Sequence, residues 1–276
     1  MIFSFSLIAG LYLFLIQQLS LPITTGQNQY QENRMKAENY IFKQPSCKAV
    51  ILGSSLSDGL KEEYFEGSVC NLAFGGGSVL WGGPIIMASA FRPQVVLIET
   101  NVLVPMNQDF MASLFGQPDH SLKKISLFFH QASQPVTQIL NWLRIKFPPK
   151  PKGLNSEQVE SWIKYYSETY KQVTISEKKI FQDNFEHLKI LLDQMKDSGL
   201  EIILYEMPID PKLKTTEKIL WERQFWLKYA QENKLKFISL VLTSDMKTKD
   251  GLHLEEPALK SIAPILRSSI ELKLKN

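Results

Sequence analysis

Short apolar runs alternate along the chain with longer stretches whose apolar residues recur at helical spacing. The runs are rich in Val, Ile and Leu, end in glycine, proline or polar residues, and cover residues 50–52, 69–74, 93–99, 201–208 and 236–240. Runs this short and this apolar are typical of buried parallel strands. Helix-length segments separate the first three runs, and this alternation predicts βαβ units.

Helical spacing is clearest in the second half of the chain. After Ser156, apolar residues recur at i, i+3, i+4 and i+7, namely Val159, Trp162, Ile163 and Tyr166. A second helix is predicted over residues 176–197, because Gly199 follows it and glycine is favoured just beyond helix C-termini. Further helices are predicted over residues 215–233 and from Glu256 onward.

The alternation breaks between residues 104 and 175. This segment is rich in aromatic residues and prolines, and it includes the stiff run Phe147-Pro148-Pro149-Lys150-Pro151. Connections of this length are usually functional or carry small structure of their own. We therefore expect a helical insertion here that serves as a lid or docks a partner.

The chain opens with an apolar segment. Residues 2–16 are nearly all apolar, and a weaker apolar tail runs to Ile23. As a helix the first part would be about 22 Å long and the whole about 33 Å, against a bilayer core of roughly 30 Å. No basic residue precedes the segment and no small-x-small cleavage site follows it, so an uncleaved anchor over residues 1–23 is favoured over a signal peptide. A buried core helix is the third interpretation.

The rest of the chain then divides into two parts. Polar residues 24–46 predict a linker or a short amphipathic helix, and the α/β domain is expected over residues 47–276, outside the cytoplasm. The 31 basic and 28 acidic residues are mixed along the helices, so no nucleic-acid-binding surface is expected.

The cysteines and histidines of the chain bear on metal binding and on disulfide formation. Four histidines without His-x-x-x-His spacing and two cysteines without Cys-x-x-Cys spacing make a zinc site unexpected, and no cofactor is expected. Cys47 and Cys70 each lie near the start of a predicted strand. A disulfide in an oxidising compartment and two separate buried thiols are both open interpretations.

Chemically distinctive residues follow the predicted strands. The first strand leads to Ser55, the second to Gly76 and the third to Asn101, while the loop before the last helix holds Asp250-Gly251-Leu252-His253. Because the carboxyl ends of parallel strands share one edge of a sheet, we expect these residues to converge. Singly, each has an ordinary role, such as a helix cap or a turn residue. Their order, each after a strand, favours catalysis.

This set of residues suits acyl transfer. A serine hydroxyl needs a base to take its proton, and His253 can be that base for Ser55 if Asp250 holds the other ring nitrogen. The tetrahedral intermediate carries a negative oxygen, for which the backbone N–H groups of Ser55 and Gly76 and the side-chain amide of Asn101 are candidate donors. No Lys-Ser/Thr follows the glycine run 75–77, so a nucleotide-binding loop is not favoured.

Here the sequence resembles the SGNH, or GDSL-type, hydrolases, named for the Ser, Gly, Asn and His of four sequence blocks. Gly53-Ser54-Ser55-Leu56-Ser57 is similar to Gly-Asp-Ser-Leu-Ser, and Asn71-Leu72-Ala73-Phe74-Gly75-Gly76-Gly77-Ser78 is similar to the second block. Ile98-Glu99-Thr100-Asn101 resembles Gly-x-Asn-Asp, with Glu99 for its glycine and Val102 for its aspartate. Asp250-Gly251-Leu252-His253 matches Asp-x-x-His in full. The likeness covers about residues 47–103 and 200–270.

The resemblance implies a three-layer α/β/α domain with a five-stranded parallel sheet, the flavodoxin-like SGNH hydrolase fold. It also implies ester chemistry without a metal, with Ser55 as the nucleophile. The departures at Ser54, Glu99 and Val102 concern substrate positioning more than the triad.

The apolar N-terminus and the long insertion look most like envelope polysaccharide O-acetylation proteins, which work beside membrane acyltransferases. The expectation is therefore a membrane-anchored, extracytoplasmic serine esterase or O-acyltransferase acting on a carbohydrate or other acyl ester, with a membrane acyltransferase as partner. The alternative is a catalytically inactive member that binds a glycan or that partner. An α/β-hydrolase is less favoured, because the turn reads Gly-x-Ser-x-Ser rather than Gly-x-Ser-x-Gly.

Overall fold

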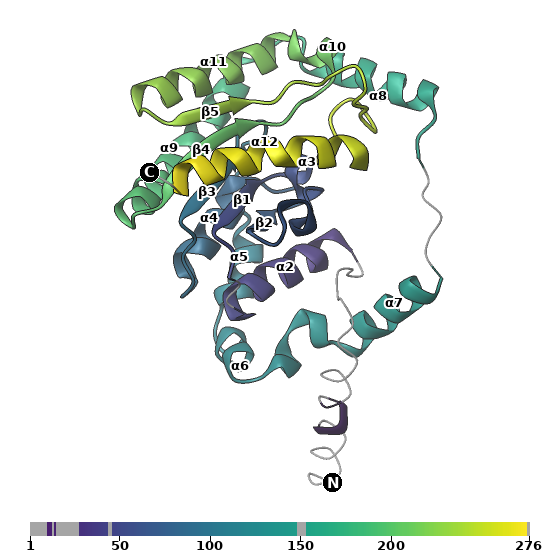
Figure 1. The fold of residues 1–276 in the computed structure, drawn as a ribbon, viewed down its shortest axis with the longest axis vertical. Helices are drawn as coiled ribbons and strands as arrows, with labels where there is room; N and C mark the ends of the chain where they lie inside the picture. The colour runs from purple at the N-terminus through teal and green to yellow at the C-terminus, as the bar shows by residue number, and fades with distance from the viewer. Residues whose placement is uncertain (1–9, 13, 15–27, 44–45, 148–152, 275–276) are drawn as a thin grey trace. The chain divides into compact units, whose positions relative to one another are not determined.

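The computed structural model describes residues 10–12, 14, 28–43, 46–147 and 153–274 (Figure 1). Contacts within the chain divide it into two compact units. Unit 1 comprises Met1–Lys43 and Gln108–Pro151, and unit 2 comprises Gln44–Asn107 and Lys152–Asn276. Each unit is described by itself below.

Unit 2 is built on one sheet. Its strands are β1 (Ala49–Gly53), β2 (Val69–Ala73), β3 (Val95–Glu99), β4 (Glu201–Glu206) and β5 (Lys236–Ser239). They lie in the order β2-β1-β3-β4-β5, and every neighbouring pair is parallel. The prediction of a five-stranded parallel sheet is therefore confirmed. All positions of β1, β2 and β3 are buried, which explains why polar residues do not alternate along them.

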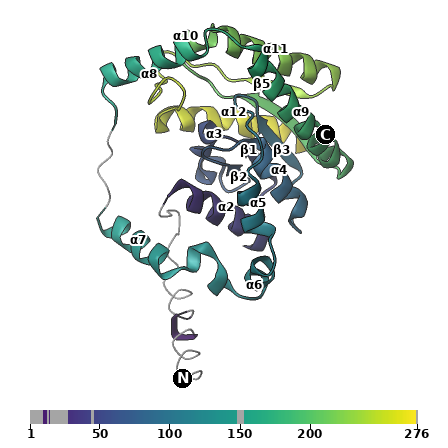
Figure 2. The same ribbon diagram turned by 180° about the vertical axis from the view of Figure 1, so that it is seen from behind.

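Helices cover both faces of this sheet. On one face lie α12 (Glu256–Leu274), α3 (Ser55–Asp58) and the 3-10 turn η1 (Glu62–Phe65), whose apolar side chains share one core with the strands. On the other face lie α4 (Val79–Ala88), α9 (Ile175–Asp197) and α11 (Glu217–Glu232). Figure 1 shows α12 in front of the strands, and Figure 2, seen from behind, brings α4 and α9 forward. Unit 2 is thus a three-layer α/β/α domain.

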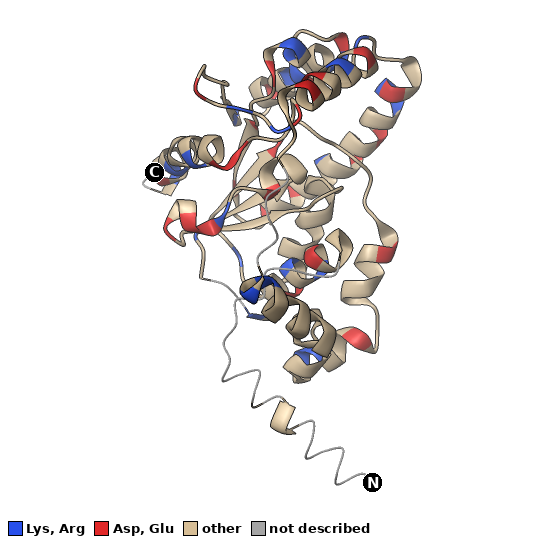
Figure 3. Cartoon of the chain, turned by 90° about the vertical axis from the view of Figure 1, so that its right-hand side faces the viewer, with Lys and Arg blue, Asp and Glu red and all other residues tan. Residues whose placement is uncertain are grey.

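Unit 2 also contains α8 (Ser156–Thr169) and the short helix α10 (Pro211–Lys214). The helices predicted from spacing are all present, and Gly199 after α9 has a φ of 79°, the left-handed conformation expected beyond a helix end. Lysine, arginine, aspartate and glutamate are interspersed along the helices (Figure 3).

Unit 1 is helical. It contains α2 (Gln29–Lys43), α5 (Gln108–Phe115), α6 (Asp119–Ile125), η2 (Leu127–Phe129), η3 (Gln131–Ser133) and α7 (Pro135–Lys146). The buried Lys123 of α6 pairs with the buried Glu38 of α2 at 3.0 Å, and the Gln131 N–H donates to the same carboxylate at 2.7 Å. Residues 29–43, assigned above to a linker or short helix, therefore pack with the first part of the insertion.

The predicted anchor over residues 1–23 falls almost wholly outside the described residues. Within the parts of the chain that the structure describes, no helix combines the length and the apolar composition that a membrane crossing requires.

The two cysteines form a disulfide. Cys70 lies on β2 opposite Val50 of β1, and Cys47 lies two residues before β1, so the pairing of the strands brings the two sulfurs together. The structure thus selects one of the two interpretations that the sequence left open.

We predict that replacing both cysteines, Cys47→Ala with Cys70→Ala, lowers the free energy of unfolding by about 3 kcal/mol. The bridge joins residues 23 apart and restricts the unfolded chain accordingly. Urea unfolding of the oxidised protein and the variant measures the difference, with the reduced wild type as the control that should match the variant. Equal midpoints for all three samples would contradict the prediction.

Helix α11 holds a carboxyl group in an unusual environment. The pKa of Glu222 is raised from 4.5 to about 7, chiefly by burial; the charge of Lys218 opposes this rise, and the charge of Glu177 adds to it. Between these two pKa values the native state binds a proton that the unfolded chain does not. Its stability therefore falls as the pH rises through this window.

Replacing this group with an amide, Glu222→Gln, should remove that pH dependence. We expect wild type and variant to be similar in stability near pH 4, and the variant to be more stable at pH 8 by up to about 3 kcal/mol. Urea midpoints measured at both pH values test this, with Glu168→Gln, an exposed glutamate of α8, as the control. A difference that does not change with pH would refute the assignment to Glu222.

Candidate active site

Ser55 occupies the first position of α3, directly after β1. The helix cap is its neighbour Ser54, whose Oγ accepts the backbone N–H two residues further on at 3.2 Å. The hydroxyl of Ser55 is therefore not used as a cap. Asn71 of β2 holds the other end of α3, because its side chain donates to the carbonyls of Ser57 and Leu60, both at 2.8 Å.

His253 lies between Ser55 and Asp250. Its Nε2 is 2.9 Å from the Ser55 Oγ, and its Nδ1 is 2.7 Å from the Asp250 Oδ2. The side chains of His253 and Asp250 are 34% and 18% exposed, so a substrate can reach the imidazole while the carboxylate is more sheltered. The structure brings these three residues together across 198 positions of sequence.

The carboxylate of Asp250 is held in its ionised form. Burial alone would raise its pKa, but hydrogen bonds from the His253 ring and from the backbone N–H groups of Leu252 and His253 outweigh burial and lower the pKa below its usual value. An ionised carboxylate at this position fixes the imidazole ring and stabilises a positive charge on it.

The loop that carries these groups is tightly folded. Thr248 and Leu254 pair in an antiparallel bridge, and the Gly251 N–H donates to the Thr248 Oγ1 at 3.0 Å. Gly251 has a φ of 93°, and a Cβ there would lie 2.7 Å from the Cγ1 of Ile163 in α8. Glycine is therefore required at this position both by backbone conformation and by space.

The three candidate oxyanion donors differ in their surroundings. Gly76, in the turn after β2, is exposed and has a φ of 71°. Among the described residues, neither its N–H nor that of Ser55 forms a backbone hydrogen bond. The Asn101 side chain, in contrast, is tied to the end of β4: its Nδ2 donates to the Met207 carbonyl at 3.0 Å, and its Oδ1 accepts the Met207 N–H at 2.6 Å. One N–H of the Asn101 amide remains outside this pair.

Glu99, at the end of β3, forms a buried network next to residues 53–57, which we call the nucleophile turn because they contain the candidate nucleophile Ser55. Its Oε1 accepts the Ser54 hydroxyl at 2.6 Å, and its Oε2 accepts the Ser54 N–H at 3.0 Å and the Ser57 hydroxyl at 2.5 Å. The Tyr205 hydroxyl of β4 donates in turn to the Ser57 Oγ at 2.6 Å. A Cβ at Gly53 would lie 2.5 Å from the Glu99 Oε2, so only glycine fits there.

Burial shifts the acidity of this network. It raises the pKa of Glu99, and the hydrogen bonds from Ser54 and Ser57 oppose that shift only in part. Burial, together with the charge of Glu99, also raises the pKa of Tyr205 well above its usual value. Tyr205 therefore stays a hydroxyl donor, and the hydrogen bonds run from Tyr205 through Ser57 to the carboxyl group.

Sequence reasoning treated Ser54 and Glu99 as separate departures from the blocks that the chain resembles. In the structure the two side chains face each other and are hydrogen-bonded. The sequence shows a serine after the first strand and a glutamate at the end of the third. Only the pairing of β1 with β3 shows that the two side chains are in contact. The third departure, Val102, packs against the apolar core.

We predict that Glu99→Gln loosens the nucleophile turn. A glutamine places an NH₂ group against hydroxyl or N–H donors, which leaves at least one buried donor unpaired and costs about 1–3 kcal/mol of stability. Urea unfolding measures this loss of stability. Because Ser55 is then held less firmly, the rate at which a fluorophosphonate labels it should also fall, by about tenfold or more. The control is Glu186→Gln, an exposed glutamate of α9. Wild-type stability and labelling in Glu99→Gln would contradict the role of this carboxylate.

No family model matches the chain, and no curated protein matches it. The solved structures that are similar to it include two bacterial proteins. A Bacteroides fragilis protein named as an acylhydrolase has a TM-score of 0.48 and 14% identity, over 90% of this chain and 100% of that one. A GDSL-like lipase from Bacteroides thetaiotaomicron has a TM-score of 0.44 and 14% identity, over 88% and 98%.

Proposed function

We propose that the chain is a serine-dependent esterase or O-acyltransferase that works through an acyl-enzyme on Ser55. One observation carries the proposal: a single imidazole is hydrogen-bonded to a serine hydroxyl on one side and to an ionised carboxylate on the other. This arrangement is one that activates a serine nucleophile: the base takes the hydroxyl proton, and a third group orients the base.

In the first half of the proposed reaction, the Ser55 Oγ attacks the carbonyl carbon of an acyl ester while the His253 Nε2 takes the hydroxyl proton. Negative charge develops on the carbonyl oxygen. The N–H groups of Ser55 and Gly76 are the proposed hydrogen-bond donors to that oxygen. The intermediate collapses when its C–O bond to the alcohol breaks. His253 returns the proton to that alcohol, which leaves Ser55 acylated.

In the second half, an acceptor hydroxyl attacks the acyl carbon and His253 takes its proton. The bond between the acyl carbon and the Ser55 Oγ then breaks, and His253 returns the proton to that oxygen. Water as acceptor releases the acid, whereas a sugar hydroxyl becomes acylated. Both outcomes use the same residues, because Asp250 stabilises the imidazolium in each half of the cycle. Esterase and transferase therefore differ in the acceptor that reaches the site, not in the catalytic groups.

Within this proposal the substrate is an acyl ester of a cell-envelope polysaccharide, and the protein is membrane-anchored with unit 2 outside the cytoplasm. The disulfide supports an oxidising compartment, since such bonds are rare in the cytosol. The apolar N-terminal sequence supports an anchor. Apolar side chains left exposed on α7 of unit 1 support docking to a membrane acyltransferase, and they include Val136, Ile139, Trp142 and Ile145.

A second candidate is a catalytically inactive module that binds a glycan or that membrane partner. One observation favours it: both polar atoms of the Asn101 side chain are engaged by Met207, so the third candidate oxyanion donor is in part committed elsewhere. Reactivity at Ser55 separates the two candidates.

We predict that Ser55→Ala lowers the hydrolysis of 4-nitrophenyl acetate by about a thousandfold or more, because the nucleophile is lost while the fold is kept. The rate of nitrophenol release by the purified full-length chain measures this effect. Ser268→Ala, which removes an exposed serine hydroxyl of α12, should retain wild-type rates.

The same samples test the inactive alternative. After treatment with a fluorophosphonate, intact mass should increase by one adduct in the wild type and in Ser268→Ala, but not in Ser55→Ala. An unlabelled wild type with no esterase activity would remove the catalytic proposal and leave the binding module.

A further inference from the structure

Helix α8 and the residue that follows it carry four aromatic side chains, which we call the aromatic platform: Trp162, Tyr165, Tyr166 and Tyr170. Trp162 stacks on Tyr166, and Tyr166 on Tyr170, with ring centroids 5.7 and 5.8 Å apart and interplanar angles of 25° and 21°. Tyr165 packs edge-on against Trp162 and Tyr166. Each ring is thus held by its neighbours before any ligand arrives.

The outer part of the platform faces solvent. Trp162 is 43% exposed and Tyr165 is 58% exposed. Large aromatic side chains contribute most of their stabilisation when they are buried, so two neighbouring rings left in water indicate a surface that a ligand covers.

The inner side of α8 packs against the loop of the candidate active site. A Cβ at Gly251 would lie 2.7 Å from Ile163, and Tyr166 packs on the same apolar cluster as Ile163. Burial raises the pKa of Tyr166, and the charge of Asp250 is the next contributor, so this ring lies within electrostatic range of the candidate catalytic carboxylate. The platform and the catalytic groups therefore border one another within unit 2.

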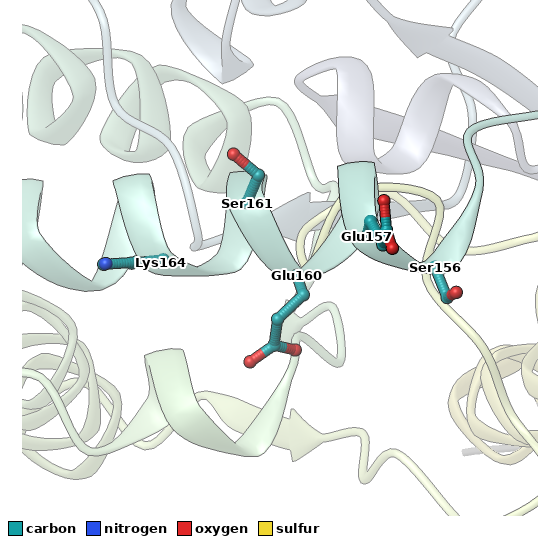
Figure 4. Close-up of a pocket in the computed structure, with 5 residues that line it drawn as sticks. All are labelled: Ser156, Glu157, Glu160, Ser161 and Lys164. Atoms are coloured by element: carbon teal, nitrogen blue, oxygen red, sulfur yellow. The ribbon is translucent and has the colours of Figure 1, made fainter.

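The surroundings of the platform are polar. On another side of the same helix, an open hollow of about 610 Å³ is lined by Ser156, Glu157, Glu160, Ser161 and Lys164 (Figure 4). Glu160 also forms an ion pair with Lys212 of α10. Hydroxyl, carboxylate and ammonium groups thus lie on the same helix as the exposed rings, with charges of both signs.

These features favour one class of ligand. An acyl chain needs an enclosed apolar slot, which an open platform with a polar rim does not supply. A phosphate-bearing ligand needs a cluster of cations, whereas Glu157 and Glu160 offset Lys164 here. A pyranose ring has an apolar face of C–H groups and a rim of hydroxyls. One sugar unit can therefore lie flat on Trp162, and the hydroxyls of neighbouring units of the polymer can bond polar side chains of the same helix.

We propose that the aromatic platform is a sugar-binding subsite that holds a polysaccharide beside Ser55. The identity of the reacting group rests on the function proposed above, but binding by the platform does not require the chemistry to occur. Carbohydrate would be recognised through the rings of Trp162 and Tyr165, and the loop of Asp250 and His253 would receive the acyl ester of the same polymer.

Affinity electrophoresis tests this proposal, with the full-length chain in neutral detergent and native gels that contain acetylated xylan or acetylated alginate. We expect the wild type to be retarded by at least one polymer. The double variant Trp162→Ala with Tyr165→Ala should bind that polymer at least fivefold more weakly. The matched control is Ile180→Ala with Ile190→Ala on α9, which removes side chains that are 55% and 59% exposed and should bind as the wild type does.

Further samples make the result decisive. Trp162→Phe with Tyr165→Phe keeps flat rings and should retain binding, which guards against misfolding of the alanine variant. Ser55→Ala should be retarded as the wild type is, so failure of the esterase proposal would appear in the aryl acetate assay and not here. The inference is overturned if neither polymer retards the wild type, or if the alanine variant is retarded equally. Flotation with phosphatidylcholine vesicles tests a lipid ligand. The inference is also overturned if the alanine variant loses binding to these vesicles but binds the polymer as the wild type does.

Discussion

The buried carboxyl group of Glu99 is the constraint on which the nucleophile turn depends. A fully buried carboxylate is costly unless donors surround it, and here Ser54 supplies two and Ser57 a third. These bonds fix the residues on both sides of Ser55 relative to β3, and the close approach of the carboxyl group leaves room only for glycine at position 53. The position of Ser55 is therefore set by a group on another strand rather than by its own contacts.

The parallel sheet brings the other residues of the candidate site to the same edge as Ser55. Strands β1, β2 and β3 run in one direction, so the segments that follow them emerge at one edge of the sheet. The loop that carries Asp250 and His253 comes to the same place, where its tight fold is supported by Ile163 of α8. The insertion thus contributes α8 to the α/β domain, while its earlier helices pack with α2 in unit 1.

The site combines fixed and exposed parts. Glu99 and Tyr205 are fully buried, whereas His253, Trp162 and Tyr165 are accessible to solvent. Within the proposed function, a buried network that holds Ser55, with accessible groups around it, suits a substrate that is larger than the bond to be cleaved.

The sequence by itself determined the five strands, the helices of unit 2 and the convergence of Ser55 with Asp250 and His253. Those features follow from apolar periodicity and from the geometry of parallel strands, which are both local rules. The sequence also indicated Gly76 and Asn101 as oxyanion donors, but it could not show that the Asn101 amide bonds Met207.

Only the tertiary structure decided the remaining points, because each depends on which segments lie side by side. It selected the disulfide over two free thiols, because β1 and β2 are neighbours. It assigned the helix cap to Ser54 and made Glu99 its partner, since β1 and β3 are paired. It also placed Ile163 of α8 against Gly251 in the loop of Asp250, a contact between residues too far apart in sequence for any periodic pattern to predict.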